Sequence, residues 1–272
     1  MKRTDTASKE QIIESLDSYN IVMIGAGNVS THISRHFHSA GHRISCIFSR
    51  TEASARRLAG ELGVPGTSRL ESVPMDADFY IIAVPDRVVV ETGKQFSPAK
   101  GIWLHTAGSL SLDILKNIFE QYGVLYPLQT LSRSRPIEPS QVPCLVEGSS
   151  PRVTASLMKL ASSVYKRVEE ATSEQRLVIH AAAVFANNFS NHMVHIAKQL
   201  LSDQQIDPGL LDPLLQETFE KIKEMGTQQG RTGPAVRGDQ ETIKKHIELL
   251  KGHPEWEKLY TFISRDIERS RE

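Results

Sequence analysis

The sequence predicts an α/β domain with a doubly wound, mainly parallel sheet, followed by an all-α domain. Short apolar segments alternate with segments of helical periodicity from Tyr19 to Ala171, which is typical of a parallel sheet covered by helices. From Ser173 onward helical periodicity continues and strand signals almost vanish. The first apolar segment also breaks into a glycine-rich turn, as such sheets do where they bind ligands. We therefore expect a domain boundary between Ala171 and Thr172.

Strands and helices alternate along the first domain, residues 19–171. Each expected strand is a short apolar or β-branched segment, and the helices between them repeat apolar residues at helical spacing. The expected strands are residues 21–24, 43–48, 64–67, 79–84, 101–104, 124–126, 143–147 and 166–169. The expected helices are residues 29–39, 53–62, 87–95, 111–121 and 152–163.

The second domain, residues 172–272, is expected to contain helices only. A long helix over residues 173–202 begins with Ser173 as its N-cap and Glu174 in its first turn. Further helices are expected at residues 210–225, 242–250 and 255–269. The polar residues 1–18 are expected to form an arm outside the fold.

The first expected strand is followed directly by the sequence Gly25-Ala26-Gly27-Asn28-Val29-Ser30. A strand that breaks into Gly-x-Gly-x-x-small and then a helix is the pattern that binds a dinucleotide pyrophosphate. Gly25 lets the chain turn sharply, and Gly27 leaves room for the phosphates, which the N–H groups of the following helix attract. The alternative is a glycine turn that only packs. Ser30 stands at the third small position, where Gly or Ala is usual.

The end of the second strand indicates which dinucleotide is bound. An NAD site places an acid there to hold the ribose hydroxyls, but the segment is Ser49-Arg50-Thr51, and Glu52 follows only after the strand tip. The Arg50 guanidinium suits a 2′-phosphate, with hydroxyl donors on either side, so NADP is favoured over NAD. The alternative is a solvated surface arginine. The expected cofactor-binding residues are Gly25, Gly27, Asn28, Val29, Ser49, Arg50, Thr51, Val84 and Pro85.

Composition is that of an ordinary enzyme and excludes several other classes. Of the 272 residues, 39% are apolar, enough to build the cores of two domains. The formal net charge of zero argues against nucleic acid or an anionic membrane as partner. Cys46 and Cys144 lie in apolar segments and are expected to be buried thiols. Without a long apolar segment or a signal peptide, the protein is expected to be cytoplasmic, and no metal site is predicted.

Two loops at the ends of later strands carry candidate chemistry. His105-Thr106-Ala107-Gly108-Ser109 follows the fifth strand, at the edge where open α/β sheets bind ligands. His105 could act as acid or base, or equally as a structural hydrogen-bonding residue, and Ser109 is expected to contact substrate. Tyr126-Pro127-Leu128-Gln129-Thr130 follows the sixth strand, and its rigid turn offers the amide of Gln129 to a substrate.

The long helix carries a polar stripe. At about 100° per residue, His180, Asn187 and Asn191 fall on one stripe, with Arg176 one turn before His180. We expect His180 and Asn187 to be catalytic and Asn191 to bind substrate; the alternative is hydrogen bonding between helices, or plain exposure. The small residues 181–183 would let another helix approach closely, which favours a homodimer formed through this domain.

A turn over residues 230–239 carries the last candidate. Its sequence, Gly-Arg-Thr-Gly-Pro-Ala-Val-Arg-Gly-Asp, places two arginines and an aspartate before a helix. Asp239 is expected to cap that helix. Arg237 is the better candidate for binding an anionic substrate or a partner subunit.

Taken together, these motifs resemble one family. Gly-Ala-Gly-Asn-Val, His-Thr-Ala-Gly-Ser, Tyr-Pro-Leu-Gln-Thr, His-Ala-Ala-Ala-Val-Phe-Ala-Asn-Asn and Thr-Gly-Pro-Ala-Val-Arg-Gly-Asp are similar to motifs of bacterial Rossmann-like NADP oxidoreductases with a C-terminal helical domain of unknown function. The resemblance runs from Tyr19 to the C-terminus. It implies kinship with pyrroline-5-carboxylate reductases, ketopantoate reductases, the 6-phosphogluconate dehydrogenase superfamily and deazaflavin-dependent NADP reductases. It also implies an N-terminal NADP domain, an active site in a cleft between the domains and, usually, a dimer.

One departure from the related families leaves two hypotheses open. The hydroxyacid dehydrogenases and ketopantoate reductases carry a catalytic lysine, followed by an asparagine, early in the first helix after the cofactor domain. Here the single lysine of that helix is Lys198, near its far end, and His180 occupies the early position. The first hypothesis is an oxidoreductase that transfers a hydride between NADP(H) and a small C=O or C=N substrate in the interdomain cleft. The alternative is a non-catalytic NADP(H)-binding sensor or regulatory protein.

Overall fold

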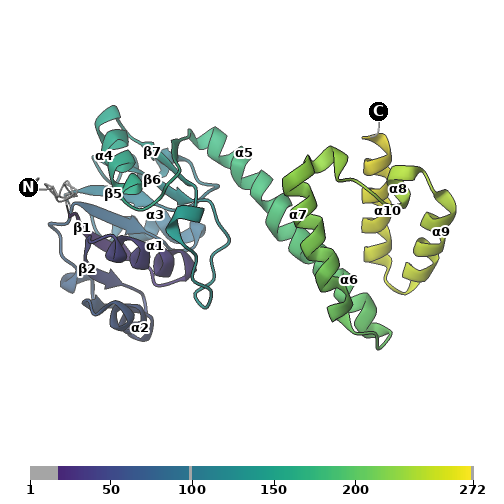
Figure 1. Ribbon diagram of the computed structural model, residues 1–272. Coiled ribbons are helices and arrows are strands. Elements are labelled where there is room, and N and C mark those ends of the chain that lie inside the picture. Colours follow the sequence, from purple (N-terminus) through teal and green to yellow (C-terminus); the bar gives the residue numbers. More distant parts are fainter. Residues whose placement is uncertain (1–17, 98–99, 271–272) are drawn as a thin grey trace, which may run out of the picture. The chain divides into compact units, whose positions relative to one another are not determined.

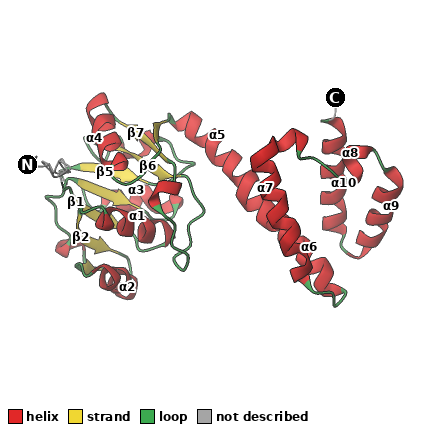
Figure 2. Cartoon of the chain, viewed as in Figure 1, coloured by secondary structure: helices red, strands yellow, loops and turns green. Residues whose placement is uncertain are grey.

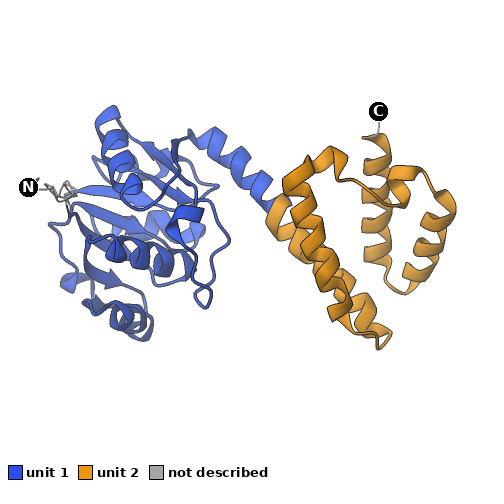
Figure 3. Ribbon diagram, viewed as in Figure 1, with its two compact units in different colours: residues 1–185 blue, residues 186–272 orange. Residues whose placement is uncertain are grey.

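The computed structural model describes residues 18–97 and 100–270 (Figure 1). The chain divides into two compact units, the first ending at Phe185 and the second beginning at Ala186 (Figure 3). The predicted arm, residues 1–18, lies almost entirely outside the described residues. None of the helices in the described ranges is long and apolar enough to cross a membrane.

The first unit is built on an eight-stranded sheet with the order β3-β2-β1-β4-β5-β6-β7-β8 among the residues described. Neighbouring strands are parallel except for β6 and β7, which are antiparallel. This confirms the predicted doubly wound, mainly parallel sheet. The strands are β1 Asn20–Ile24, β2 Arg43–Phe48, β3 Gly66–Thr67, β4 Phe79–Ile82, β5 Ile102–His105, β6 Tyr122–Pro127, β7 Cys144–Gly148 and β8 Val168–Glu170.

The helices of the first unit follow the predicted order with one exception. They are α1 Asn28–Ser39, α2 Glu52–Leu62, α3 Val89–Lys94, α4 Pro151–Ser162 and α5 Ser173–Ala183. The predicted helix at residues 111–121 is wrong, because only a short 3₁₀ helix, Leu112–Leu115, forms there. In it the amide of residue i+3 donates to the carbonyl of residue i, as the Lys116 amide does to the Asp113 carbonyl at 3.1 Å. Leu115 and Phe119 are buried by these tight turns.

Side chains alternate between the two faces of the sheet and build two cores. In β1, Ile21 and Met23 face the core that contains residues of α1, α2 and α4. Val22 and Ile24 face the opposite core, where Trp103 stacks between the rings of Tyr80 and Phe119 at centroid distances of 4.2 and 4.0 Å.

The two cysteines, Cys46 and Cys144, are buried free thiols, as predicted. Burial raises the pKa of the Cys46 thiol to about 11, so it is inert as a nucleophile at neutral pH.

The described part of the second unit is helical throughout (Figure 2). Its α-helices are α6 Ser190–Asp203, α7 Asp212–Gln229, α8 Pro234–Arg237, α9 Gln240–Leu249 and α10 Pro254–Arg269. This confirms the predicted all-α region at the C-terminal end. Asp239 caps α9 as predicted, since its Oδ1 accepts a hydrogen bond from the Thr242 amide at 3.0 Å.

The predicted helix at residues 173–202 differs in two respects. Its N-cap is Thr172 and not Ser173, because Thr172 and Gln175 form a reciprocal capping box. A π-helical segment, Val184–Phe189, also separates α5 from α6. A π turn closes its hydrogen bonds at i→i+5 and so changes the phase of the helix. The stripe that relates His180 to Asn187 and Asn191 by 3.6-residue periodicity therefore does not carry across the segment.

Candidate functional site

The glycine turn after β1 has the geometry that its sequence predicts. Gly25 has a φ of 115°, and a Cβ there would collide with the carbonyl oxygen of Ala83, so no other residue fits. A Cβ on Gly27 would instead meet nothing within 4 Å. Ser30 is buried, and its hydroxyl donates to the Gly25 carbonyl at 2.6 Å. The departure from Gly or Ala at this third position therefore adds a hydrogen bond that supports the turn.

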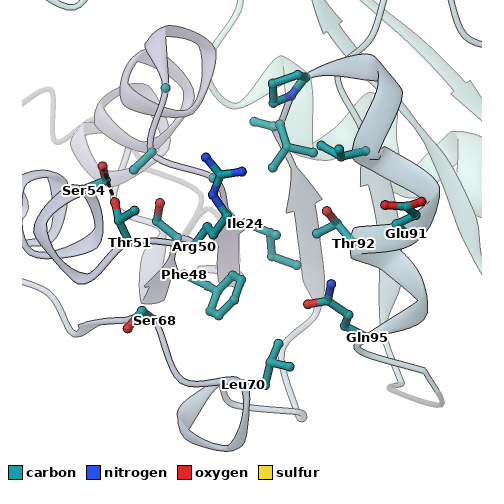
Figure 4. A pocket seen from close by; sticks show the side chains of 18 of the residues that line it. Ile24, Phe48, Arg50, Thr51, Ser54, Ser68, Leu70, Glu91, Thr92 and Gln95 are labelled. Atoms are coloured by element: carbon teal, nitrogen blue, oxygen red, sulfur yellow. Dashed lines mark hydrogen bonds between the residues drawn. The ribbon is translucent and has the colours of Figure 1, made fainter.

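A cavity of about 690 Å³ opens beside this turn, between the ends of β1, β2 and β4 (Figure 4). This is where the strand order reverses, because β2 and β3 lie on one side of β1 and β4 on the other; open α/β sheets bind ligands at such a point. The cavity lining includes the predicted residues Gly25, Gly27, Ser49, Arg50, Thr51, Val84 and Pro85. Asn28 and Val29 are at the start of α1 and do not line it.

The opposite wall of the cavity was not predicted. It comes from α3 and from the segment after β3, which supply the side chains of Leu70, Glu91, Thr92 and Gln95 (Figure 4). These residues belong to no sequence motif, because their position depends on how α3 and the segment after β3 pack beside the ends of the strands.

Arg50 and Glu52 differ in what they are free to bind. The Glu52 carboxylate accepts hydrogen bonds from the amide and hydroxyl of Ser68, at 3.0 and 2.8 Å, and from Arg56. These bonds, the Ser68 hydroxyl first, lower the pKa of Glu52, and its side chain does not line the cavity. Arg50 lines the cavity, is exposed and has no ion-pair partner among the described residues. A cation without a carboxylate is therefore available at the end of β2.

A second group of polar residues gathers at the carboxyl ends of β5 and β6. The Tyr126 hydroxyl and His180 Nδ1, from α5, are 3.1 Å apart. Gly108, in the loop after β5, packs directly on this pair. A Cβ on Gly108 would be 2.7 Å from His180 Nδ1 and 2.9 Å from Tyr126 Cζ, so the pair needs glycine at this position.

Tyr126 was absent from the predicted site residues. The signal that could have identified it is its place at the end of the sixth strand, in the Tyr-Pro-Leu-Gln-Thr motif. Burial raises the pKa of its phenol, and the positive charge of Arg176 partly opposes that shift. The phenol is therefore protonated at neutral pH.

The neighbouring Ser109 connects this pair to the cavity beside the glycine turn. Its hydroxyl donates to the Asp86 carboxylate at 2.6 Å, and Asp86 follows Pro85, a residue of the cavity lining. Gln129 lies farther along the loop after β6 and is exposed, with its side-chain oxygen accepting the Thr130 amide at 2.8 Å.

His105 has a different environment from His180. It is the last residue of β5 and is 0% exposed, and its Nδ1 accepts the Ala107 amide at 3.2 Å. Burial, followed by the charge of Arg176, lowers its pKa to about 4, and the backbone of Ser111 acts in the opposite direction. The ring is therefore neutral at physiological pH and, since Nδ1 is an acceptor, carries its proton on Nε2.

The remaining predicted residues belong to the second unit. Asn187 lies in the π-helical segment, Asn191 in the first turn of α6 and Arg237 in the last turn of α8, and all three are exposed. Arg237 sits between Gly233 and Gly238, whose φ angles are 108° and 71°. His180 therefore lies with Tyr126 and the loop of Ser109 in the first unit. Asn187, Asn191 and Arg237 belong to the second unit.

Two family models match the chain. Residues 20–102 match the family described as NADP oxidoreductase, coenzyme F420-dependent, and residues 142–267 match a domain of unknown function, DUF2520. A comparison with curated protein sequences gave no match.

Solved structures match over nearly the whole chain. A putative NADP oxidoreductase from Bacteroides fragilis is 36% identical, with a TM-score of 0.88, over 94% of this chain and 100% of that one. A 1-pyrroline-5-carboxylate reductase from Streptococcus pyogenes is 12% identical, with a TM-score of 0.64, over 93% and 99% of the two chains. An imine reductase from Myxococcus stipitatus, solved with NADP+, is 12% identical, with a TM-score of 0.62, over 92% and 94%. The last two likenesses show the shared fold.

Proposed function

The chain belongs to the family of NADP oxidoreductases that carry this C-terminal helical domain, and from that premise we propose a reaction and its residues. The protein transfers a hydride between NADP(H) and a small C=O or C=N substrate. The observation that carries the proposal is the Tyr126–His180 hydrogen bond, at the same edge of the sheet as the cavity beside the glycine turn.

The residues of the cavity fit NADP. Gly27 leaves open the space that the pyrophosphate requires, and the N-terminus of α1 offers unpaired N–H groups to it. Arg50, which has no ion-pair partner among the described residues, is suited to the 2′-phosphate. Glu52, the acid that could have selected NAD, is held by Ser68 and Arg56. When bound, the nicotinamide supplies the hydride.

Tyr126 and His180 handle the proton. The phenol is kept protonated by burial and can donate to the oxygen or nitrogen of the substrate. The His180 imidazole, 3.1 Å away, is within hydrogen-bond reach of the phenol and can return a proton to it. His105 is less suited to this role, since it is 0% exposed and its pKa is lowered to about 4.

Ser109 supports the same site from the loop after β5. Its hydroxyl is already oriented by Asp86, and it follows Gly108, which contacts both His180 and Tyr126. We propose that Ser109 hydrogen-bonds the substrate. A part for Gln129, Asn187, Asn191 and Arg237 in catalysis or substrate binding stays a prediction.

A non-catalytic NADP(H) sensor is the second candidate function. It is favoured by one observation: Lys198, the single lysine of the segment from α5 to α6, is on α6 and pairs with Asp212 at 2.6 Å. It is thus engaged within the second unit, and no lysine stands at the early position of the helix where the related dehydrogenases use one.

A turnover assay separates the two candidates. NADPH oxidation is followed with a panel of imines, 2-keto acids and aldehydes, beside a calorimetric titration with NADPH. We expect NADPH to bind and at least one substrate class to be reduced, and this reduction to be lost in Tyr126→Phe and His180→Ala. Tight NADPH binding with no turnover of any class would favour the sensor.

We also propose that the second unit forms a homodimer. In the residues described, α6 and α7 contain no buried residue. Large apolar side chains of α7 are instead widely exposed: Leu214 60%, Phe219 53%, Ile222 38% and Met225 49%. A soluble monomer rarely leaves such a surface to water, and a second copy of the chain would cover it. Light scattering on the purified protein tests this, and a monomer at micromolar concentration would contradict it.

A further inference from the structure

A buried ion pair joins α5 to the sheet close to the proposed proton site. Arg176 is 1% exposed, and one of its terminal nitrogens, Nη1, donates to the Glu147 carboxylate on β7. Its other terminal nitrogen, Nη2, donates to the backbone carbonyl of Leu110. One guanidinium therefore binds a strand and the loop after β5 at the same time, as the planar fork of arginine allows.

Ser173 completes this network. Glu147 also accepts the amide and the hydroxyl of Ser173, at 2.9 Å each. The Ser173 hydroxyl in turn accepts the Leu112 amide at 2.9 Å. The carboxylate is thus satisfied from several directions, which is the condition under which a buried charge is tolerated. The first turn of α5 is fixed against β7 and against residues 110–112.

The network holds both sides of the contact between His180 and Gly108. His180 follows Arg176 by one helical turn and so lies on the same side of α5. Gly108 precedes Leu110 by two residues, in the loop that the guanidinium binds. Any loosening of Arg176 would let both α5 and this loop move, and with them the 3.1 Å contact between His180 and Tyr126.

We propose that the Arg176–Glu147 pair is a positioning device that holds His180 against Tyr126 and Gly108. Neither residue touches the substrate; both act through the placement of His180. The inference rests on the proposed function for its effect on turnover, but the geometry it describes can be measured without any substrate.

The test uses substitutions that keep charge or shape. Arg176→Lys retains the positive charge but cannot reach Glu147 and the Leu110 carbonyl together. Glu147→Gln retains the shape and removes the charge. The matched control is Arg167→Lys, which alters the exposed Arg167–Glu169 pair of the same unit, with side chains 70% and 52% exposed. Each variant is checked by thermal unfolding, by NADPH calorimetry and by kinetics.

The first readout is independent of turnover. The His180 imidazole is followed by NMR in selectively labelled protein and assigned by its loss in His180→Ala. Relative to the wild type, the Tyr126→Phe variant should show a shifted His180 signal, because the substitution removes the hydrogen bond. We expect Arg176→Lys and Glu147→Gln to shift it in the same way, and Arg167→Lys to leave it unchanged.

The second readout is kinetic. We expect Arg176→Lys to lower kcat by roughly tenfold to hundredfold, since misplacement of a reacting group by about 1 Å costs as much, while NADPH affinity stays constant. A wild type that reduces no substrate would end the proposed function, yet the NMR comparison would still decide the positioning role. A folded Arg176→Lys or Glu147→Gln protein with the His180 signal of the wild type would overturn the inference.

Discussion

Replacing Gly108 by alanine tests the proposed proton site with a single methyl group. The new Cβ would lie 2.7 Å from His180 Nδ1 and 2.9 Å from Tyr126 Cζ. Side chains normally keep about 3.4 Å or more from a Cβ, so His180 or the loop must move by about 0.7 Å. This movement would break the 3.1 Å contact between Tyr126 and His180. Overpacking of this size costs about 1–3 kcal/mol of stability, and the misplacement should lower kcat by up to about a hundredfold.

The assay compares turnover, NADPH affinity and thermal unfolding in the same preparation. NADPH affinity should be unchanged, because Gly108 does not line the cofactor cavity. The matched control is Gly60→Ala, in α2, where a Cβ meets nothing within 4 Å; it should raise stability by about 0.4–1 kcal/mol and leave kcat alone. A folded Gly108→Ala protein with the full kcat of the wild type would refute the reasoning.

Three further predictions address the cofactor, the acid and the pH dependence. Arg50→Ala should lower the affinity for NADPH by about one to two decades, because a charge-assisted pair is worth about 1.5–3 kcal/mol. The affinity for NADH should hardly change, and calorimetry showing an equal loss of affinity for both nucleotides would reject the assignment. His180→Ala should lower turnover by roughly 10²–10⁴-fold at constant NADPH affinity; if His105→Ala does so instead, the proton comes from the β5 loop. Since the pKa of His105 is about 4 in the folded protein and about 6.5 in the unfolded chain, the unfolded chain binds more protons between those pH values. The free energy of unfolding should therefore be highest above about pH 6.5 and fall by about 3 kcal/mol as the pH drops to about 4. Urea unfolding measures this, and His105→Asn should flatten the dependence.

The fold and the cavity beside the glycine turn could be predicted because their signals are local. The strands are short apolar segments, and β1, β2, β4 and β7 are each followed by a helix with its own periodicity. The turn from Gly25 to Ser30 lies within a few residues of β1. Its positive φ at Gly25 requires glycine, and the sequence shows glycine there. The choice of Arg50 over Glu52 was also expected, but the reason is not local: Ser68, from the segment after β3, holds the acid.

The Tyr126–His180 pair, the proposed proton site, was predicted only in part, because it is formed by contacts between distant segments. His180 was selected from a stripe of 3.6-residue period that the π-helical segment Val184–Phe189 interrupts. Nothing in the sequence around Tyr126 indicates that its hydroxyl meets a residue of α5. The same holds for Arg176, which was noted only as a neighbour of the stripe; its partner Glu147 lies on a strand that precedes the helix by a whole α-helix and strand.

Calorimetric titration of NADPH and NADH into the wild type and the Gly27→Val variant tests the central claim most directly. A side chain at Gly27 would enter space that is empty in the structure, so the variant should fold normally while its β-branched group occupies the position of the pyrophosphate. We predict that the wild type binds NADPH more tightly than NADH and that folded Gly27→Val binds neither. Unchanged NADPH affinity in folded Gly27→Val, or a wild type that prefers NADH, would contradict the account.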